Sequence, residues 1–262
     1  MPKTLYLGIS PCPNDTFIFF ALIHGKIGLP SLRFETALAD VQQLNEAALL
    51  GTFDVVKVSA AVYARLKESY VLLRSGGALG WGCGPLLVAR TPVGTPELAH
   101  ACIAVPGSLT TANRLLQLHG FHSGRVLIKR YDEILPAVAH GEAEAGLVIH
   151  EGRFTYHRYG LHHVLDLGAW WEQRTGLPLP LGCILARKDL GRETHLALEE
   201  AIRRSLDYAQ GHPEEAAPYV RSLAQEMEEA TIQEHIDTFV TSYSRDLGPD
   251  GLRAVEMLTA AV

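Results

Sequence analysis

The chain has 262 residues, of which 47% are hydrophobic and 20% are charged, and its formal net charge is −6. This length and composition fit one large domain or two lobes of ordinary size with a substantial hydrophobic core. The negative charge and the lack of a long basic stretch argue against a nucleic acid as partner. No segment approaches the roughly 18 consecutive apolar residues that span a membrane, so we expect no membrane partner either.

The four cysteines, Cys12, Cys83, Cys102 and Cys183, are scattered and form no Cys-x-x-Cys pair. Such spacing is typical of reduced thiols in a cytosolic protein rather than of a disulfide framework. The N-terminal segment MPKTLYLGISPCPND has one lysine and a short apolar run that prolines interrupt, unlike a secretory signal. We therefore expect a cytoplasmic protein, and the sequence does not indicate its oligomeric state.

Short apolar runs alternate with helical patterns along most of the chain. The sequence predicts strands at Leu5–Ser10, Phe53–Ser59, Tyr70–Arg74, Pro85–Arg90, Ala101–Pro106, Arg125–Tyr131 and Ala145–His150. It predicts helices at Thr16–His24, Val41–Leu50, Ala60–Glu68, Thr110–His119 and Asp132–His140. A late strand, Leu181–Arg187, precedes a region that is almost entirely helical from Arg192 onward. This alternation indicates an α/β fold with mainly parallel sheets.

Two similar strands, GPLLVAR ending at Arg90 and LGCILAR ending at Arg187, bracket the second series of elements. One economical explanation is that the chain leaves a first lobe, builds a second lobe and returns. We therefore predict a discontinuous first lobe over residues 1–89 and 180–262, including the C-terminal helices, and a second lobe over residues 90–179. Ligands of open α/β sheets collect beyond the carboxyl ends of the strands, so we expect a cleft between the lobes lined by strand ends of both.

The turn SPCPNDT after the first strand combines two prolines with small polar residues. The prolines stiffen the turn and restrict the residues before them. Asn14 or Asp15 can cap the helix predicted from Thr16, and the free N–H groups of that helix suit a carboxylate or polar oxygens. The turn is a candidate substrate-binding segment, although an ordinary helix cap explains the same residues.

Two other strand ends carry polar side chains. Thr110 and Thr111, in the segment PGSLTT, offer hydroxyl groups to a ligand at a helix start, or simply cap that helix. Lys57 lies in an otherwise apolar strand, two residues before Ser59. A lysine there either faces a ligand, pairs with a carboxylate such as Asp54, or points outward at a sheet edge.

His150 ends an apolar strand and has Glu151 beside it. A neutral imidazole at a strand end can act as a general base near neutral pH, while a hydrogen-bonded structural role is the simpler alternative. No HExxH, P-loop, GxGxxG or GxSxG motif is present, and His162 and His163 would face opposite sides of a strand. We therefore expect no bound metal.

Several segments in combination resemble one family. They are SPCPNDTFIF (10–19), KVS (57–59), RSGGALG (74–80), GLVIHEGRFTY (146–156) and DLGAWWEQRTGLPLPLG (166–182). Together they resemble the 1,4-dihydroxy-6-naphthoate synthases, the MqnD family of the futalosine route to menaquinone. The resemblance runs essentially from end to end.

This resemblance implies a two-lobed fold like the type II periplasmic binding proteins, used as an enzyme. It implies cleavage of cyclic dehypoxanthinyl futalosine, a small aromatic carboxylate, to 1,4-dihydroxy-6-naphthoate and dihydroxyacetone, with no metal or organic cofactor. The histidine of the IHE segment is the family's proposed proton acceptor, which falls on His150. The family's substrate contacts fall on Lys57, Val58, Ser59, Thr110 and Thr111.

Two other functions fit the same residues. A small-carboxylate-binding protein without catalysis would share the fold, because a fold does not settle a function. Chorismate dehydratase, the related MqnA activity, is the second alternative, and the SPCPNDTF turn argues against it.

Overall fold

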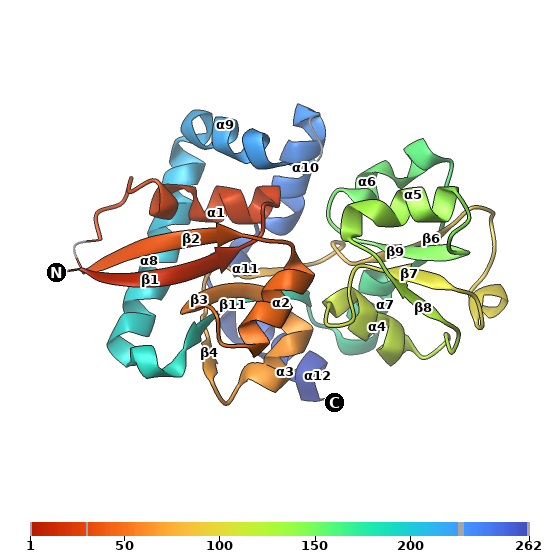
Figure 1. Ribbon diagram of the computed structural model, residues 1–262, viewed down its shortest axis with the longest axis horizontal. Coiled ribbons are helices and arrows are strands. Elements are labelled where there is room, and N and C mark those ends of the chain that lie inside the picture. Colours follow the sequence, from red (N-terminus) through yellow and green to blue (C-terminus); the bar gives the residue numbers. More distant parts are fainter. Residues whose placement is uncertain (1, 30, 225–227, 261–262) are drawn as a thin grey trace. The chain divides into compact units, whose positions relative to one another are not determined.

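The structure is a computed structural model that describes residues 2–29, 31–224 and 228–260. The chain forms two compact units (Figure 1): unit 1 comprises Met1–Gly80 with Pro180–Val262, and unit 2 comprises Trp81–Leu179. Unit 2 begins before the predicted boundary at residue 90, because Leu86–Ala89 pairs with strands of its sheet. The chain therefore passes from unit 1 to unit 2 and back again.

Unit 1 is built on a six-stranded sheet in the order β2-β1-β3-β11-β4, with β5 paired to β11. Its strands are β1 (Lys3–Ile9), β2 (Leu32–Leu38), β3 (Val55–Ser59), β4 (Tyr70–Leu72), β5 (Ala78–Gly80) and β11 (Leu179–Arg187). Its α-helices are α1 (Pro13–Ile23), α2 (Val41–Leu49), α3 (Tyr63–Leu66), α8 (Arg192–Gly211), α9 (Pro213–Leu223), α10 (Glu229–Phe239), α11 (Ser242–Arg245) and α12 (Gly248–Ala260). Its described residues also form the 3-10 helices η1 (Ala60–Val62) and η5 (Lys188–Leu190).

Strand β1 is parallel to both of its neighbours, and its residue Leu7 pairs with Val55 of β3. The loops that follow β1 and β3 therefore leave the same edge of the sheet, which places Ser10 and Ser59 at that edge. Strand β11 runs antiparallel to β3 and β4.

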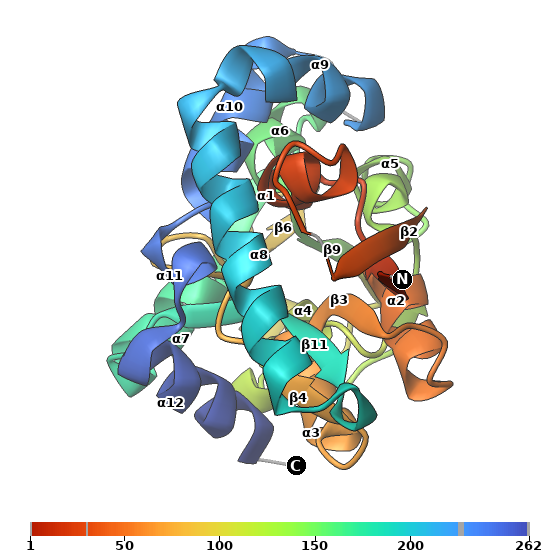
Figure 2. The same cartoon turned by 90° about the vertical axis from the view of Figure 1, so that its left-hand side faces the viewer.

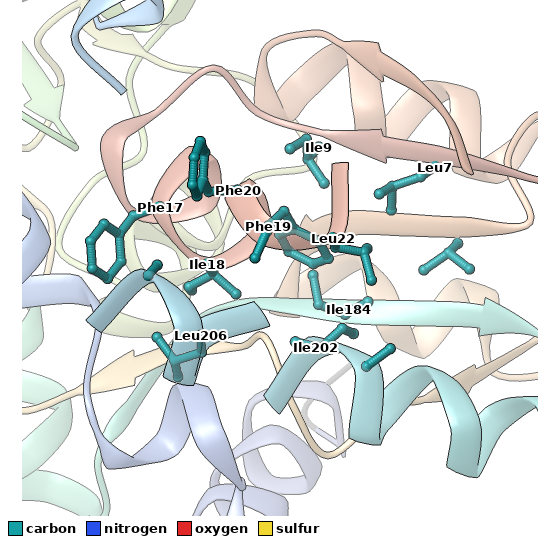
Figure 3. Close-up of a cluster of buried hydrophobic side chains, with 14 of the residues drawn as sticks. Leu7, Ile9, Phe17, Ile18, Phe19, Phe20, Leu22, Ile184, Ile202 and Leu206 are labelled. Carbon is teal, nitrogen blue, oxygen red and sulfur yellow. The ribbon is translucent and has the colours of Figure 1, made fainter. Parts of the chain in front are cut away.

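Helix α1 is buried on nearly all sides, since every residue from Pro13 to Leu22 is buried. A helix that is apolar all round needs cover on every face. The C-terminal helices α8, α9 and α10 supply this cover in unit 1 (Figure 2). Figure 3 shows Ile18 and Phe19 of α1 in the cluster that contains Ile184 of β11 and Ile202 of α8. Burying each such side chain stabilises the fold by about 1.5–3 kcal/mol, which anchors the turn before α1.

Unit 2 is built on a five-stranded sheet in the order β10-β6-β9-β7-β8. Its strands are β6 (Leu86–Ala89), β7 (Ile103–Val105), β8 (Val126–Ile128), β9 (Ala145–Val148) and β10 (His162–Asp166). Its α-helices are α4 (Thr111–His119), α5 (Ile134–Ala139), α6 (Gly152–Thr155) and α7 (Leu167–Thr175). Its 3-10 helices are η2 (Pro96–Leu98), η3 (Tyr131–Glu133) and η4 (Tyr156–Tyr159).

Both sheets are mixed rather than mainly parallel. Strand β7 is parallel to β8 and β9, whereas β6 is antiparallel to β9 and β10. A parallel pair of strands needs a long crossover connection between them. The chain passes from one unit to the other at β6 and β11, and these two strands pair antiparallel with β9 and β3, respectively. The prediction of an α/β protein with a helical C-terminal region is confirmed. Among the described residues, no helix combines the length and apolar character needed to cross a bilayer.

Candidate active site

The turn between β1 and α1 differs from the predicted helix cap. Helix α1 starts at Pro13 rather than at Thr16, and Cys12, in an extended conformation, is the N-cap residue. Proline fits the first helical position because its ring presets φ and no N–H is needed there. The Thr16 hydroxyl donates to the carbonyl oxygens of Cys12 and Pro13, at 3.0 and 3.2 Å. The prediction that Asn14 or Asp15 caps this helix is therefore wrong.

The Asp15 carboxylate is instead the centre of a buried polar cluster in unit 1. Its Oδ2 accepts from the Ser10 hydroxyl at 2.7 Å and from the Ser10 backbone N–H at 3.3 Å. Its Oδ1 accepts from Asn14 Nδ2 at 2.8 Å and from the Lys57 ammonium group. Because Asp15 is only 1% exposed, these four donors stabilise its charge in place of water.

Lys57 points inward from β3 and forms its ion pair with Asp15, not with Asp54, the partner that the sequence leaves open. Asp54 accepts from the Tyr6 backbone N–H instead. The lysine side chain passes over Gly182 of the neighbouring strand β11, where an added Cβ would lie 2.6 Å from Lys57 Cε. The glycine that ends the segment LPLPLG therefore makes room for the lysine. Removing one partner of such a buried pair typically costs about 3–5 kcal/mol.

The cluster continues to a histidine that is not among the residues predicted from the sequence. His235 of α10 is fully buried, and its Nε2 lies 2.9 Å from Asn14 Oδ1, although the two residues are 221 positions apart. The available signal in the sequence is the helical period of α10, which places His235 on the same buried face as Ile232 and Phe239. A polar residue at an inward position is a candidate for a buried hydrogen bond.

Ser59 is fixed at the end of β3 by Asn45 of α2. The Ser59 backbone N–H donates to Asn45 Oδ1 at 2.8 Å, and Asn45 Nδ2 donates to the Ser59 hydroxyl at 3.0 Å. Val58, the residue between Lys57 and Ser59, is fully buried in the core of unit 1. Unit 1 thus brings Asn14, Asp15 and Lys57 into one hydrogen-bonded cluster and holds Ser59 at the same sheet edge.

In unit 2, Thr110 is the N-cap residue of α4. Its hydroxyl oxygen accepts from the Asn113 backbone N–H at 3.3 Å and donates to the Gly107 carbonyl at 2.8 Å. Thr111 is the first helical residue, and both threonines are buried, at 2% and 3% exposure. The capping role weighed for these threonines is confirmed for Thr110, and their contact with a substrate stays a prediction.

His150 follows β9, which ends at Val148, two residues earlier than predicted. With a φ of +52°, His150 is the one non-glycine residue with positive φ among the described residues. This conformation costs on the order of 1–2 kcal/mol, and such strain is concentrated at functional sites. The Tyr131 ring lies edge-on to the imidazole, with 5.0 Å between the ring centroids. Because β7 and β9 are parallel neighbours, His150 and Thr110 lie at the same edge of the unit 2 sheet.

Burial suppresses the reactivity of two thiols, Cys83 and Cys183. Burial raises the pKa of Cys183, which lies near Lys57, and that of Cys83 to about 12. A thiol with such a pKa stays protonated at neutral pH and is not a nucleophile. In the part of the chain that the structure describes, no group of three or more His, Cys, Asp or Glu side chains could hold a metal ion. The candidate site residues are therefore hydrogen-bond donors in unit 1, Lys57 and Asn14, and the imidazole of His150 in unit 2.

Comparison with solved structures defines the class of fold. The alkanesulfonate-binding protein SsuA from Xanthomonas axonopodis pv. citri, solved with bound MOPS, matches with a TM-score of 0.69 over 91% of this chain and 84% of its own, at 11% sequence identity. The fold is therefore that of the periplasmic-binding-protein-like proteins, as the resemblance implied.

The family follows from closer relatives. Residues 5–262 match the family described as Menaquinone biosynthesis. The 1,4-dihydroxy-6-naphthoate synthase of Thermus thermophilus is 56% identical, and that of Streptomyces coelicolor is 44% identical, each over 98% of this chain and 93% of its own. Protein AF1704 from Archaeoglobus fulgidus is 34% identical, with a TM-score of 0.92 over 97% of this chain and 95% of its own. The chain belongs to the menaquinone biosynthesis family.

Proposed function

We propose that this chain is a 1,4-dihydroxy-6-naphthoate synthase of menaquinone biosynthesis. Its identity of 56% and 44% to two relatives of that name, over 98% of the chain, carries the proposal. We further propose that it is a carbon–carbon lyase that needs no metal or organic cofactor. Its substrate would be cyclic dehypoxanthinyl futalosine and its products 1,4-dihydroxy-6-naphthoate and dihydroxyacetone. The cytoplasmic location expected from the sequence stays a prediction.

In this proposal His150 is the general base. It removes a proton from the substrate and so starts the cleavage of the carbon–carbon bond, and formation of an aromatic ring supplies much of the driving force. The left-handed turn at His150 and the edge-on contact with Tyr131 support this role, because they restrict the orientation of the imidazole.

Unit 1 is proposed to bind the substrate carboxylate through Lys57 and Asn14. Asp15 takes one of the three Lys57 N–H groups and one of the two Asn14 amide N–H groups. Within the described residues the remaining N–H groups of these two side chains have no acceptor, so they can donate to a carboxylate. Asp15 and Thr16 then act indirectly, since Asp15 holds the lysine and Thr16 bonds the backbone of the turn.

The remaining contacts are proposed at the strand ends. The Ser59 hydroxyl in unit 1, and Thr110 and Thr111 in unit 2, suit the sugar-derived hydroxyl groups of the substrate, because hydroxyl groups both donate and accept hydrogen bonds. Val58 is buried, so its part is to hold the strand that carries its two neighbours.

The alternative functions are a carboxylate-binding protein and a chorismate dehydratase. The first is favoured by one observation, the likeness of the fold to SsuA, which was solved with a bound sulfonate. A binding protein needs donors for an anion, which unit 1 has, and it needs no general base. Product analysis separates the three activities directly.

The experiment incubates purified protein with cyclic dehypoxanthinyl futalosine, and in parallel with chorismate, and follows the products by mass spectrometry. His150→Asn removes the base, and His163→Asn, an exposed histidine of β10, is the matched control. We expect naphthoate from the wild type and the control, and a kcat at least about 100-fold lower for His150→Asn with little change in KM. Unchanged turnover of His150→Asn would remove His150 from the mechanism. Tight binding without product from the wild type would favour a binding protein, and dehydration of chorismate would favour the dehydratase.

A further inference from the structure

The Asn14 amide has one possible orientation in its buried environment. One end of the amide faces Asp15 Oδ1, which as a carboxylate oxygen only accepts, so this end must be the Nδ2 donor at 2.8 Å. The other end is then Oδ1, which only accepts and faces His235 Nε2 at 2.9 Å. His235 must therefore carry its proton on Nε2.

His235 and Asp15 thus hold the two ends of the amide, and His235 is the partner of its carbonyl end. Without a donor at His235, the Asn14 carbonyl would lie in the interior without its partner, and rotation of the amide would place Oδ1 against the Asp15 carboxylate. Both arrangements are unfavourable, because a buried acceptor needs a donor and two acceptors repel each other. The Asn14 N–H group assigned to the substrate carboxylate points correctly only in this orientation, which His235 holds at the carbonyl end.

We propose that His235 is a positioning residue for substrate binding, acting through Asn14 on the cluster of Asp15 and Lys57. The proposal rests on the proposed function, because it takes the substrate carboxylate as the ligand of that cluster. It also gives α10 a role beyond covering α1, since the His235 imidazole joins α10 to Asn14 in the first turn of α1.

The test compares three variants with the wild type in the naphthoate assay. His235→Leu removes the donor and keeps an apolar side chain, whereas His235→Gln keeps an N–H group that can reach Asn14 Oδ1. Phe239→Leu is the matched structural control, because Phe239 is 5% exposed and its ring packs on His235 with 4.6 Å between centroids. Thermal unfolding of each variant reports on the fold, and ¹⁵N chemical shifts of labelled histidine report which ring nitrogen of His235 is protonated.

We expect His235→Leu to raise KM by about tenfold with kcat within twofold of wild type, as for the loss of one well-placed hydrogen bond. We expect His235→Gln to restore KM, Phe239→Leu to change the melting temperature but not KM, and the ¹⁵N shifts to show the Nε2–H tautomer. An unchanged KM in folded His235→Leu, or an equal rise in Phe239→Leu, would overturn the proposal. If His235→Leu does not fold, failure of His235→Gln to keep KM, or an Nδ1–H tautomer in the wild type, overturns it. A wild type that forms no naphthoate would instead refute the proposed function.

Discussion

The ion pair of Lys57 with Asp15 allows a direct test of how unit 1 is stabilised. Both side chains are buried, with 6% of Lys57 and 1% of Asp15 exposed. In Lys57→Met the apolar stem stays and the ammonium group is lost, which leaves the Asp15 carboxylate with only the neutral donors of Ser10 and Asn14. Loss of one partner of a buried pair lowers the free energy of unfolding by about 3–5 kcal/mol. This is a large fraction of the roughly 5–15 kcal/mol that stabilises a typical protein.

The assay is urea and thermal unfolding of the wild type, Lys57→Met, Asp15→Asn and the double variant. For a chain of this size, about 3–5 kcal/mol corresponds to a melting temperature lower by roughly 6–20 °C. The double variant removes both charges, so it should be more stable than the sum of the two single losses predicts. Lys26→Met is the control, because Lys26 pairs with Glu215 at the surface, where water replaces the lost partner and little change is expected.

Two results would refute this reasoning. The first is a Lys57→Met variant that loses less than about 1 kcal/mol, which would mean that water or a rearranged donor reaches the carboxylate. The second is strict additivity of the two single changes in the double variant, which would mean that the two charges do not stabilise each other.

Two further predictions concern the thiols and the close contact under the lysine. Burial raises the pKa of Cys83 and of Cys183 to about 12, so both thiols should resist iodoacetamide at pH 8 in the folded protein. The half-buried Cys102 should be modified under the same conditions. Peptide mass spectrometry checks this prediction, and rapid labelling of Cys183 would contradict it. Gly182→Ala places a Cβ 2.6 Å from the lysine Cε, so it should displace the ammonium group, cost about 1–3 kcal/mol and raise KM. If Gly182→Ala had the same free energy of unfolding and the same KM as the wild type, the lysine side chain would have another position available to it.

The sequence predicts the strands that carry the candidate site. Strands β1, β3, β7 and β9 are short apolar runs bounded by turn residues, and each of their ends agrees with the prediction to within two residues. The turn residues after them are local signals as well. The predicted start of α1 lies three residues late, because Pro13 suits a rigid turn as well as the first helical position that it occupies.

The contacts between these elements could not be predicted from the sequence. The spacing of residues does not indicate that Asp15 rather than Asp54 faces Lys57, because that choice depends on which strand lies beside β3 and on the space above Gly182. The bond of His235 with Asn14 joins residues 221 positions apart. Strand β2, absent from the predicted elements, is partly exposed, and apolar and polar residues alternate only over its first four positions, so the signal for a strand is short.

The two units contribute different chemistry, and this decides what each variant should change. In unit 1 the buried charges of Lys57 and Asp15 are paired with each other, and in the proposed function this cluster binds the substrate carboxylate. Changes at Lys57, Gly182 or His235 should therefore appear mainly in KM, because they weaken binding of the substrate and binding of the transition state alike. His150 is different, since the proposed function makes its imidazole the proton acceptor, and its backbone adopts a positive φ. If the proposed function is correct, kcat should therefore respond to His150→Asn, whereas the variants at Lys57, Gly182 and His235 should change mainly KM.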